Sequence, residues 1–352
     1  MWLDELSVEN VRSLQRVDLR LHPGLNLIWG GNGSGKTSLL EAIFLLGRGR
    51  SFRTRTTERL IRYGEQRLIS FGRLANHVPR ALGVQVSKTS GTEAKVDGRF
   101  VASLAELAQA FPVQVIEPGV HRLVEEGGHR RRRWLDWAVF HVEPTYVETW
   151  GRYARALRQR NMALRSSPEE SRIWDPELAR DGELLAASRS SLLARLEPYW
   201  SGTVRELTDL DVELIHHRGW DAGRSLAEAL ASHAAQDRIR GVTHMGPHRA
   251  DVRVRVHGRA ARDVLSRGQQ KLVAAAMILS QLELLRDAVE MVPTLLLDDP
   301  AAELDRERLD RFIAVVQRTT RQLVTTALEP DARLFGMPER VFHVEQGSVQ
   351  PL

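Results

Sequence analysis

Alternating apolar and polar side chains open the chain. Through residues 2–28 the alternation predicts short strands with one buried face. The apolar positions of the first two strands are Leu6, Val8, Val11, Val17, Leu19 and Leu21. A short apolar run at residues 25–28 predicts a third, buried strand. Residues 67–101 predict antiparallel strands, and Asp97-Gly98 is typical of a two-residue hairpin turn. The first hundred residues are therefore expected to be rich in sheet.

A helical spacing of apolar residues takes over in the middle of the chain. It predicts helices over residues 146–165, 176–199 and 225–238, with a loop at 166–175. This stretch, from about 144 to 230, is interpreted as a helical insertion or arm. No long heptad run occurs in it, so an extended coiled coil is not expected.

A glycine-rich segment follows the third strand, and strong helix formers come directly after that segment. Gly30, Gly35, Lys36 and Thr37 fit the pattern G-x-x-x-x-G-K-[ST]. Its backbone N–H groups can surround phosphate oxygens at a helix N-terminus, while the lysine reaches the β- and γ-phosphates. A flexible glycine loop is the alternative, which the strand-to-helix context disfavours. The expected nucleotide contacts are Gly30, Gly31, Asn32, Gly33, Ser34, Gly35, Lys36 and Thr37.

A second apolar strand, predicted at residues 294–297, ends in two carboxylates. Asp298 is placed to hold Mg²⁺ through water, together with the Thr37 hydroxyl, and Asp299 is placed to orient the attacking water. An acidic helix cap after a strand is the alternative. The phosphate loop upstream favours the nucleotide interpretation, with ATP and Mg²⁺ as cofactors.

The segment Leu265-Ser266-Arg267-Gly268-Gln269 opens a long helix that is predicted to run to Val289. Its hydroxyl, N–H groups and helix dipole can bind an anion, although serine is also an ordinary N-cap. Together with its position about 30 residues before the carboxylate strand, it resembles the signature motif of the ABC ATPase family, Leu-Ser-Gly-Gly-Gln. In that family the motif binds the γ-phosphate of ATP held by the other subunit. The resemblance implies that Ser266, Arg267, Gly268 and Gln269 contact ATP in an ATP-dependent homodimer.

Further ABC elements are implied by the same resemblance. Gln114, on a strand predicted within residues 111–116, matches the Q-loop glutamine that senses metal and water, although taken alone it favours a buried core amide. Residues 302–305 resemble the D-loop. Thr325 or Thr326 follows a strand predicted at 322–324, where ABC proteins often have histidine.

The expected catalytic residues are Asp299, Gln114 and Thr325, and the expected metal residues are Thr37, Asp298 and Gln114. Asp299 is one methylene shorter than the usual glutamate of the family, and a threonine replaces the usual histidine. Both departures predict slow hydrolysis, with ATP acting as a timed clamp.

Composition narrows the class of protein. The 352 residues are 42% hydrophobic, enough for a large core or two domains. The absence of cysteine excludes disulfides, thiolate metal sites and thiol catalysis, and fits a reducing cytosol. No signal-peptide pattern and no apolar run of about 18 residues occur, so an intracellular, soluble protein without membrane partners is expected.

Arginine dominates the basic residues. Net charge is +5, and only four of the 50 basic residues are lysines, a ratio that codon bias in a GC-rich genome can explain. Only the positions of the arginines along the chain can therefore support an argument for DNA binding. Two clusters stand out, one on a glycine-broken loop after the first helix and one of four consecutive arginines; both could instead be solvated. The candidate DNA contacts are Arg53, Arg55, Arg130, Arg131, Arg132 and Arg133.

Taken over nearly its whole length, the chain resembles the RecF family of SMC-like bacterial recombination mediators. The resemblance rests on Gly-Asn-Gly-Ser-Gly-Lys-Thr at 31–37, Gly-Arg-Gly-Arg-Ser-Phe-Arg at 47–53, Arg-Arg-Arg-Trp-Leu-Asp-Trp at 131–137, Gly-Pro-His-Arg at 246–249, Leu-Ser-Arg-Gly-Gln-Gln-Lys at 265–271 and Asp-Asp at 298–299. The chain departs from the family pattern at Gly119, Glu126 and Gly128, where an acidic residue, a glycine and a proline are usual.

The resemblance implies an α/β fold: a P-loop ABC/SMC-type ATPase head with an inserted, mainly helical arm. The expected division is head lobe I at 1–140, arm at 141–240 and head lobe II at 241–352. It further implies a slow, DNA-stimulated ATPase in the cytoplasm, associated with the nucleoid. ATP-driven dimerisation is implied on single-stranded, duplex and gapped DNA, with RecR and RecO as partners that promote RecA loading and SOS induction.

Two other functions remain open from the residues alone. The chain could be the ATPase subunit of another machine, such as a transporter, which copurification with a membrane subunit would reveal. It could also be a regulator that binds ATP and dimerises without turnover.

Overall fold

The computed structural model describes residues 1–301, 304–330 and 336–352. The chain forms two compact units: unit 1 consists of residues 1–120 and 290–352, and unit 2 of residues 121–289. These divisions fall at other residues than the predicted lobe boundaries after 140 and 240.

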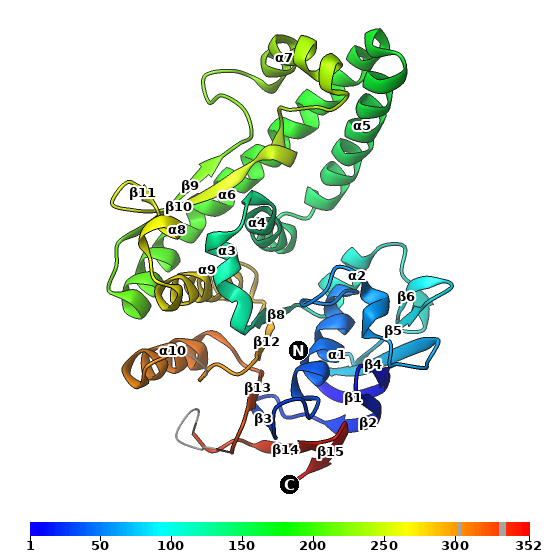
Figure 1. Cartoon of the computed structure of the whole chain (residues 1–352), viewed down its shortest axis with the longest axis vertical. Coiled ribbons are helices and arrows are strands. Elements are labelled where there is room, and N and C mark those ends of the chain that lie inside the picture. The colour runs from blue at the N-terminus through cyan, green and yellow to red at the C-terminus, as the bar shows by residue number, and fades with distance from the viewer. Residues whose placement is uncertain (302–303, 331–335) are drawn as a thin grey trace. The chain divides into compact units, whose positions relative to one another are not determined.

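Unit 1 contains an antiparallel sheet built from the first hundred residues (Figure 1). Its strands are β1 (Trp2–Val11), β2 (Leu14–Arg20), β4 (Arg67–Ala75), β5 (Arg80–Ser87), β6 (Gly91–Val96) and β7 (Arg99–Phe100), in the order β2-β1-β4-β5-β6-β7. The predicted hairpin at Asp97-Gly98 is confirmed, since both residues adopt positive φ, 51° and 80°.

The second sheet of unit 1 brings together strands from distant parts of the sequence. Its strands are β3 (Leu25–Trp29), β8 (Val113–Ile116), β12 (Thr294–Leu297), β13 (Leu323–Ala327), β14 (Arg340–Glu345) and β15 (Ser348–Pro351), in the order β15-β14-β3-β13-β12-β8. All neighbours are parallel except β14 and β15. The carboxyl ends of the parallel strands therefore lie at one edge, where α/β proteins bind ligands.

One hydrophobic core joins the two sheets of unit 1. Helix α1 (Lys36–Arg48) follows β3, and an unbroken apolar stretch of it is buried against residues of both sheets, among them Leu6 of β1 and Phe342 of β14. Helix α2 (Leu104–Ala110) packs against α1, and α10 (Arg306–Thr319) lies between β12 and β13 in the sequence. This packing fixes α1, and with it the loop that precedes it.

Unit 2 is mainly helical, as predicted. Its long helices are α5 (Tyr146–Ser166), α6 (Asp175–Thr208), α7 (Leu226–Arg240) and α9 (Arg267–Val289); its shorter ones are α3 (Arg122–Glu125), α4 (Gly128–Val142) and α8 (Ala261–Val264). Helices α5 and α6 run side by side (Figure 1). Helix α6 continues past Pro198, beyond the predicted end, because Trp200 and Leu207 are buried in the packing of this segment.

A small sheet completes unit 2, with β9 (Val212–His217), β10 (Asp251–Val256) and β11 (Arg259–Ala260) in the order β11-β10-β9. Valine and arginine alternate along β10, and its valines are buried, which is typical of a strand with one buried face, whereas β9 shows no such alternation. Only Val212 of β9 is buried, so its sequence carries a weak period-two signal.

Buried ion pairs tie the helices of unit 2 together. Arg160, 1% exposed, donates to Asp175 (2.7 Å), Asp237 (2.7 Å) and the Thr243 hydroxyl (2.9 Å). Arg189, which is fully buried, forms a two-pronged pair with Asp136 at 2.7 and 2.9 Å, in the fork geometry that arginine favours. Across residues 1–301, 304–330 and 336–352, no helix has the length and apolar character needed to span a bilayer.

Candidate nucleotide-binding site

The phosphate loop lies where the sequence places it, between β3 and α1. Gly30, Gly33 and Gly35 have φ of 154°, 76° and 120°, values that favour glycine. A Cβ on Gly30 would also lie 2.2 Å from the Val344 carbonyl oxygen of β14. Residues 31–33 are exposed at the tip. The sequence therefore fits a loop whose backbone curls closely and whose N–H groups are accessible.

Lys36 is buried at the start of α1 and folds back over this loop. Its Nζ donates to the carbonyl oxygens of Gly30 (2.7 Å) and Gly31 (2.9 Å). Burial lowers the pKa of Lys36, while Asp299 and Asp298 oppose that shift. An anion in the loop would supply the charged partner that two neutral carbonyls do not.

Asp298 follows β12 and gathers two hydroxyl groups from different elements. The Thr37 hydroxyl of α1 lies 3.0 and 3.1 Å from its two carboxylate oxygens, and the Thr326 hydroxyl of β13 donates to it at 2.9 Å. Thr37 and Asp298 thus place two oxygen ligands together beside the phosphate loop. Mg²⁺ prefers such ligands and usually completes its shell with water and substrate phosphate. Among the described residues, no three His, Cys, Asp or Glu side chains group as a metal site.

Asp299 has an unusual backbone and an unusual environment. Its φ is 48°, uncommon for a residue other than glycine and typical of constrained functional positions. Its N–H donates to the Thr326 hydroxyl at 2.8 Å. Burial and the adjacent Asp298 raise the pKa of Asp299, while Lys36 opposes the shift. The result is a carboxylate of increased basicity in a fixed position, suited to orienting water.

The structure distinguishes the two threonines that were considered for the switch position. Strand β13 extends to Ala327, beyond the predicted end at Val324, so both threonines belong to the strand. Adjacent strand residues point to opposite faces. Thr326 makes the contacts to Asp298 and Asp299, whereas the buried Thr325 hydroxyl has no hydrogen-bond partner among the described residues.

Gln114 also departs from expectation. It is buried within β8, directly opposite Leu295 of β12, so Asp298 lies three residues further along the neighbouring strand. At about 3.3 Å per residue this is a separation of roughly 10 Å along the strand. Gln114 therefore lies apart from the side chains gathered at the strand ends, and the metal and catalytic roles expected of it stay predictions.

The signature residues Ser266 to Gln269 lie in unit 2, at the start of α9. The Ser266 N–H donates to the Gln269 side chain at 3.0 Å, and the Gln269 N–H donates to the Ser266 hydroxyl at 3.3 Å, which is a reciprocal N-cap. Arg267 is exposed and Gly268 half-buried. Of the predicted D-loop, Ala302 and Glu303 lie outside the described residues.

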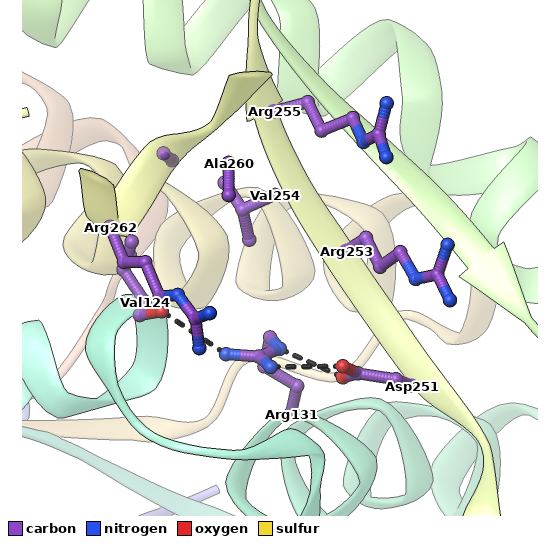
Figure 2. Close-up of a pocket in the computed structure, with 9 residues that line it drawn as sticks. Val124, Arg131, Asp251, Arg253, Val254, Arg255, Ala260 and Arg262 are labelled. Atoms are coloured by element: carbon purple, nitrogen blue, oxygen red, sulfur yellow. Dashed lines mark hydrogen bonds and ion pairs between the residues drawn. The ribbon is translucent and has the colours of Figure 1, made fainter. Parts of the chain in front are cut away.

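The run of four arginines is only partly available to a ligand. Arg131 of α4 is 8% exposed; its guanidinium pairs with Asp251 of β10 at 2.8 and 3.0 Å and donates to three backbone carbonyls, including that of Val124. Figure 2 shows this pair beside a pocket of about 280 Å³. Arg132 donates to the Ala250 carbonyl. Both guanidinium groups therefore hold other parts of unit 2 in place, and the DNA contacts expected of Arg131 and Arg132 stay predictions.

The other predicted DNA contacts differ in exposure. Arg130 pairs with Glu126 of the preceding loop, and Arg133 is exposed. On the loop after α1, Arg55 is exposed, and Arg53 lies 3.6 Å from Glu41 with its side chain 49% exposed. Sequence reasoning missed Glu41. The available signal was a single carboxylate within the apolar helix of residues 38–46.

The chain is similar to RecF proteins over nearly its whole length. The family described as "RecF/RecN/SMC N terminal domain" matches residues 2–349. The DNA replication and repair protein RecF of Pseudomonas aeruginosa (strain LESB58) is 40% identical over 359 residues, covering 99% of this chain and 97% of the relative. The protein of the same name from Shewanella denitrificans is 38% identical, covering 99% of each.

Solved structures are similar over the whole chain. The recombination mediator protein RecF with ATP, from the RecFOR pathway, has a TM-score of 0.90 at 27% identity and covers 100% of this chain and 97% of that one. An Smc head bound to the C-terminal winged-helix domain of ScpA has a TM-score of 0.60 at 14% identity, with coverage of 100% and 97%. The second likeness shows the fold alone, that of an SMC-type ABC ATPase head.

Proposed function

Because the chain belongs to the RecF/RecN/SMC N-terminal domain family, and within it to the RecF proteins, we propose that it is an ATP-dependent DNA-binding protein of replication and recombinational repair. The observation that carries the proposal is the convergence of Lys36, Thr37, Asp298 and Asp299 at one end of the parallel sheet. These side chains come from two distant segments, the start of α1 and the end of β12, and Thr37 and Asp298 are 261 residues apart, so their meeting is not a consequence of one local motif.

In the proposed site, Lys36 and the N–H groups of residues 30–37 bind the phosphates of ATP. Thr37 and Asp298 hold Mg²⁺, which neutralises phosphate charge. Asp299 orients the attacking water, and Thr326 fixes both carboxylates through its hydroxyl and through the Asp299 N–H. Because Asp299 is short and a threonine stands in place of histidine, we infer slow hydrolysis. By family membership we propose that DNA accelerates it.

We further propose that ATP joins two copies of the chain. The exposed start of α9, Ser266 to Gln269, would contact the γ-phosphate of ATP held by the other copy. The ends of the chain would form the head of each copy, with the helical arm inserted between them. ATP then acts as a clamp that closes on binding and opens on hydrolysis.

DNA is the proposed partner of the closed dimer, at gaps and single-strand/duplex junctions. Arg53, Arg55, Arg130 and Arg133 remain the candidate contacts. Phosphate binding of this kind is largely independent of sequence and depends on salt. By family membership we propose RecR and RecO as partners, promotion of RecA loading and SOS induction, and a place in the cytoplasm with the nucleoid.

The decisive experiment measures the mass of the protein in solution, with and without ATP and Mg²⁺, and then with gapped DNA. A shift from monomer to dimer with ATP, strengthened by DNA, is expected. No shift under any condition would leave a simple nucleotide-binding domain. Dimerisation with ATP but without ATP hydrolysis would favour the second candidate, a non-hydrolysing ATP-gated regulator. The short Asp299 side chain is the observation that favours testing this candidate.

One substitution isolates the dimer contact. Ser266→Arg adds bulk and charge at the exposed start of α9, so it should leave ATP binding by the monomer intact and prevent dimerisation. Arg306→Ser, at the exposed start of α10, is a control that changes a different helix terminus. Unchanged dimerisation of Ser266→Arg would contradict the shared site.

A further inference from the structure

Glu41 is a completely buried carboxylate in the helix that follows the phosphate loop, and it has no role in the proposed ATP chemistry. It lies five residues after Lys36, about 7.5 Å further along the helix axis. A buried carboxylate is costly unless it is paired. The residues that pair with the Glu41 carboxylate therefore indicate its role.

Two arginines from different segments meet this one carboxylate. Arg12, in the turn between β1 and β2, donates to both of its oxygens at 3.1 and 3.2 Å. Arg53, on the loop after α1, forms an ion pair with it at 3.6 Å. Two positive groups share one negative group, so the cluster keeps an excess of positive charge. Both arginine side chains are partly exposed, Arg12 at 29% and Arg53 at 49%.

The loop that carries Arg53 is tied to the same carboxylate. The Ser51 hydroxyl donates to Glu41 at 2.5 Å and accepts from the N–H groups of Arg53 (3.0 Å) and Thr54 (3.1 Å). Glu41 thus holds the loop in two ways. It pairs with the Arg53 side chain, and it accepts from the Ser51 hydroxyl, which in turn accepts from two backbone N–H groups of the loop. The loop is expected to lose this position when the carboxylate is changed.

Arg12 is held as firmly from its other side. Its φ is 55°, an uncommon value for arginine, and its N–H donates to the Leu60 carbonyl at 2.7 Å. The next residue, Ser13, lies directly against the phosphate loop: a Cβ on Gly35 would be 3.0 Å from its hydroxyl. Arg12 is therefore one residue away from a side chain that touches the phosphate loop.

We propose that Glu41 is a positioning residue that holds Arg12 and Arg53 as a preformed pair for binding a phosphate group. The proposal rests on the function proposed above and deepens it. The phosphate belongs either to the bound nucleotide or to DNA, whose chemistry is the same for a guanidinium fork. Pairing through a buried carboxylate removes the cost of ordering the two long side chains at the moment of binding.

The test uses the full chain with Glu41→Gln, Arg53→Ala and the double variant. Glu41→Gln keeps the length of the side chain and an acceptor for Ser51, but it removes the charge that orders the arginines. We expect it to weaken phosphate binding by about two- to tenfold, the equivalent of ordering one or two long side chains. In the Arg53→Ala background the same change should have a much smaller effect, because one of the two groups it positions is gone.

Two titrations identify the source of the phosphate. One measures ATP affinity of the monomer without DNA; the other measures binding of gapped DNA at saturating ATP over a range of salt concentrations. If Arg53 binds a DNA phosphate, Arg53→Ala should reduce the dependence of log affinity on log salt by about one unit. If it binds the nucleotide, only the first titration should change.

The chain offers a matched control. Glu5 also pairs with two arginines, Arg20 at 3.0 Å and Arg73 at 3.4 Å, in the antiparallel sheet of unit 1. Glu5→Gln and Arg73→Ala should leave both titrations unchanged. The parent protein in the same assays tests the proposed function independently: failure of the parent to bind ATP or DNA would overturn that function, whereas parent-like binding by Glu41→Gln would overturn only the role of Glu41.

Equal effects of Glu41→Gln with and without Arg53 would also overturn the proposal, since Glu41 would then act on the helix rather than on the pair. If Glu41→Gln does not fold, Ser51→Ala replaces it, because it frees the loop while leaving the Arg12 pair in place. A smaller loss in the same titration is expected, and no loss would count against positioning.

Discussion

Charged residues are used in opposite ways in the phosphate-loop region of unit 1 and in the helical arm of unit 2. In the arm, Arg160 and Arg189 are buried, and carboxylates are placed to meet their donors. At the phosphate loop, the hydrogen bonds of Lys36 to described residues go to two carbonyl oxygens, while Asp298 and Asp299 are adjacent carboxylates. Charges that are fully paired hold a fold together, and charges concentrated without full compensation mark a site prepared for a ligand.

The largest effect is expected from removing the cation of the phosphate loop. Lys36→Ala should weaken ATP binding by at least about 100-fold, because the phosphates lose their charged donor. Equilibrium titration with ATP and Mg²⁺ checks this, with Lys88→Ala, at an exposed lysine of unit 1, as the control. Normal affinity of Lys36→Ala would remove the contrast between the two regions.

Asp299→Asn separates binding from turnover. The amide keeps the size of the side chain but cannot accept a proton, so hydrolysis should fall by about 10²- to 10⁴-fold while ATP still binds. A trapped dimer should accumulate, visible by its mass in solution. Asp18→Asn, at an exposed position of β2, should turn over like the parent; equal turnover by Asp299→Asn would show that another group orients the water.

Breaking a pair in the arm should affect stability rather than function. Arg160→Ala leaves Asp237 buried without its guanidinium partner, which should lower the free energy of unfolding of unit 2 by about 3–5 kcal/mol. Denaturant unfolding measures this, and Arg158→Ala, at an exposed position of α5, is the control. A large loss of intrinsic ATP affinity in a folded Arg160→Ala protein would contradict the division of roles.

Acid should weaken the arm by a smaller amount. Burial lowers the pKa of His248 to about 4, and its ring is bonded to Tyr153 and to the Thr243 carbonyl. The unfolded chain takes up this proton near pH 6.5 and the folded one only near pH 4, so stability is lost as pH falls between these values. The loss from this group should be about 1–2 kcal/mol at pH 5.

His248→Gln tests the assignment, because it removes the titrating ring and keeps a polar side chain. The unfolding free energy of the variant should depend less steeply on pH between 6.5 and 4 than that of the parent. His216, whose pKa is also lowered to about 4 by burial, should retain its own share of the slope. An unchanged slope would show that His248 does not contribute.

The same contrast explains what the sequence could predict. The phosphate loop was predictable because its chemistry needs fixed residue types at fixed spacing within one segment. The role of Arg131 was not, since its partner Asp251 lies 120 residues away and nothing local marks the pair. The choice between Thr325 and Thr326 depended on where β13 ends, and a shift of one residue along a strand reverses the face.

The order of strands around β3 has a consequence for how the protein is made. Both neighbours of β3, β13 and β14, are encoded after the whole of unit 2, and the Asn26 side chain bonds to Leu323 across 297 residues. At about 5–20 residues per second, a ribosome needs roughly 15–60 seconds to cover that distance. Unit 2, which is continuous in sequence, can fold during that interval. Strand β3, before the phosphate loop, cannot pair until β13 and β14 have been synthesised. A chain interrupted before β13 would carry the complete phosphate-loop motif and would still lack the sheet that makes it a binding site.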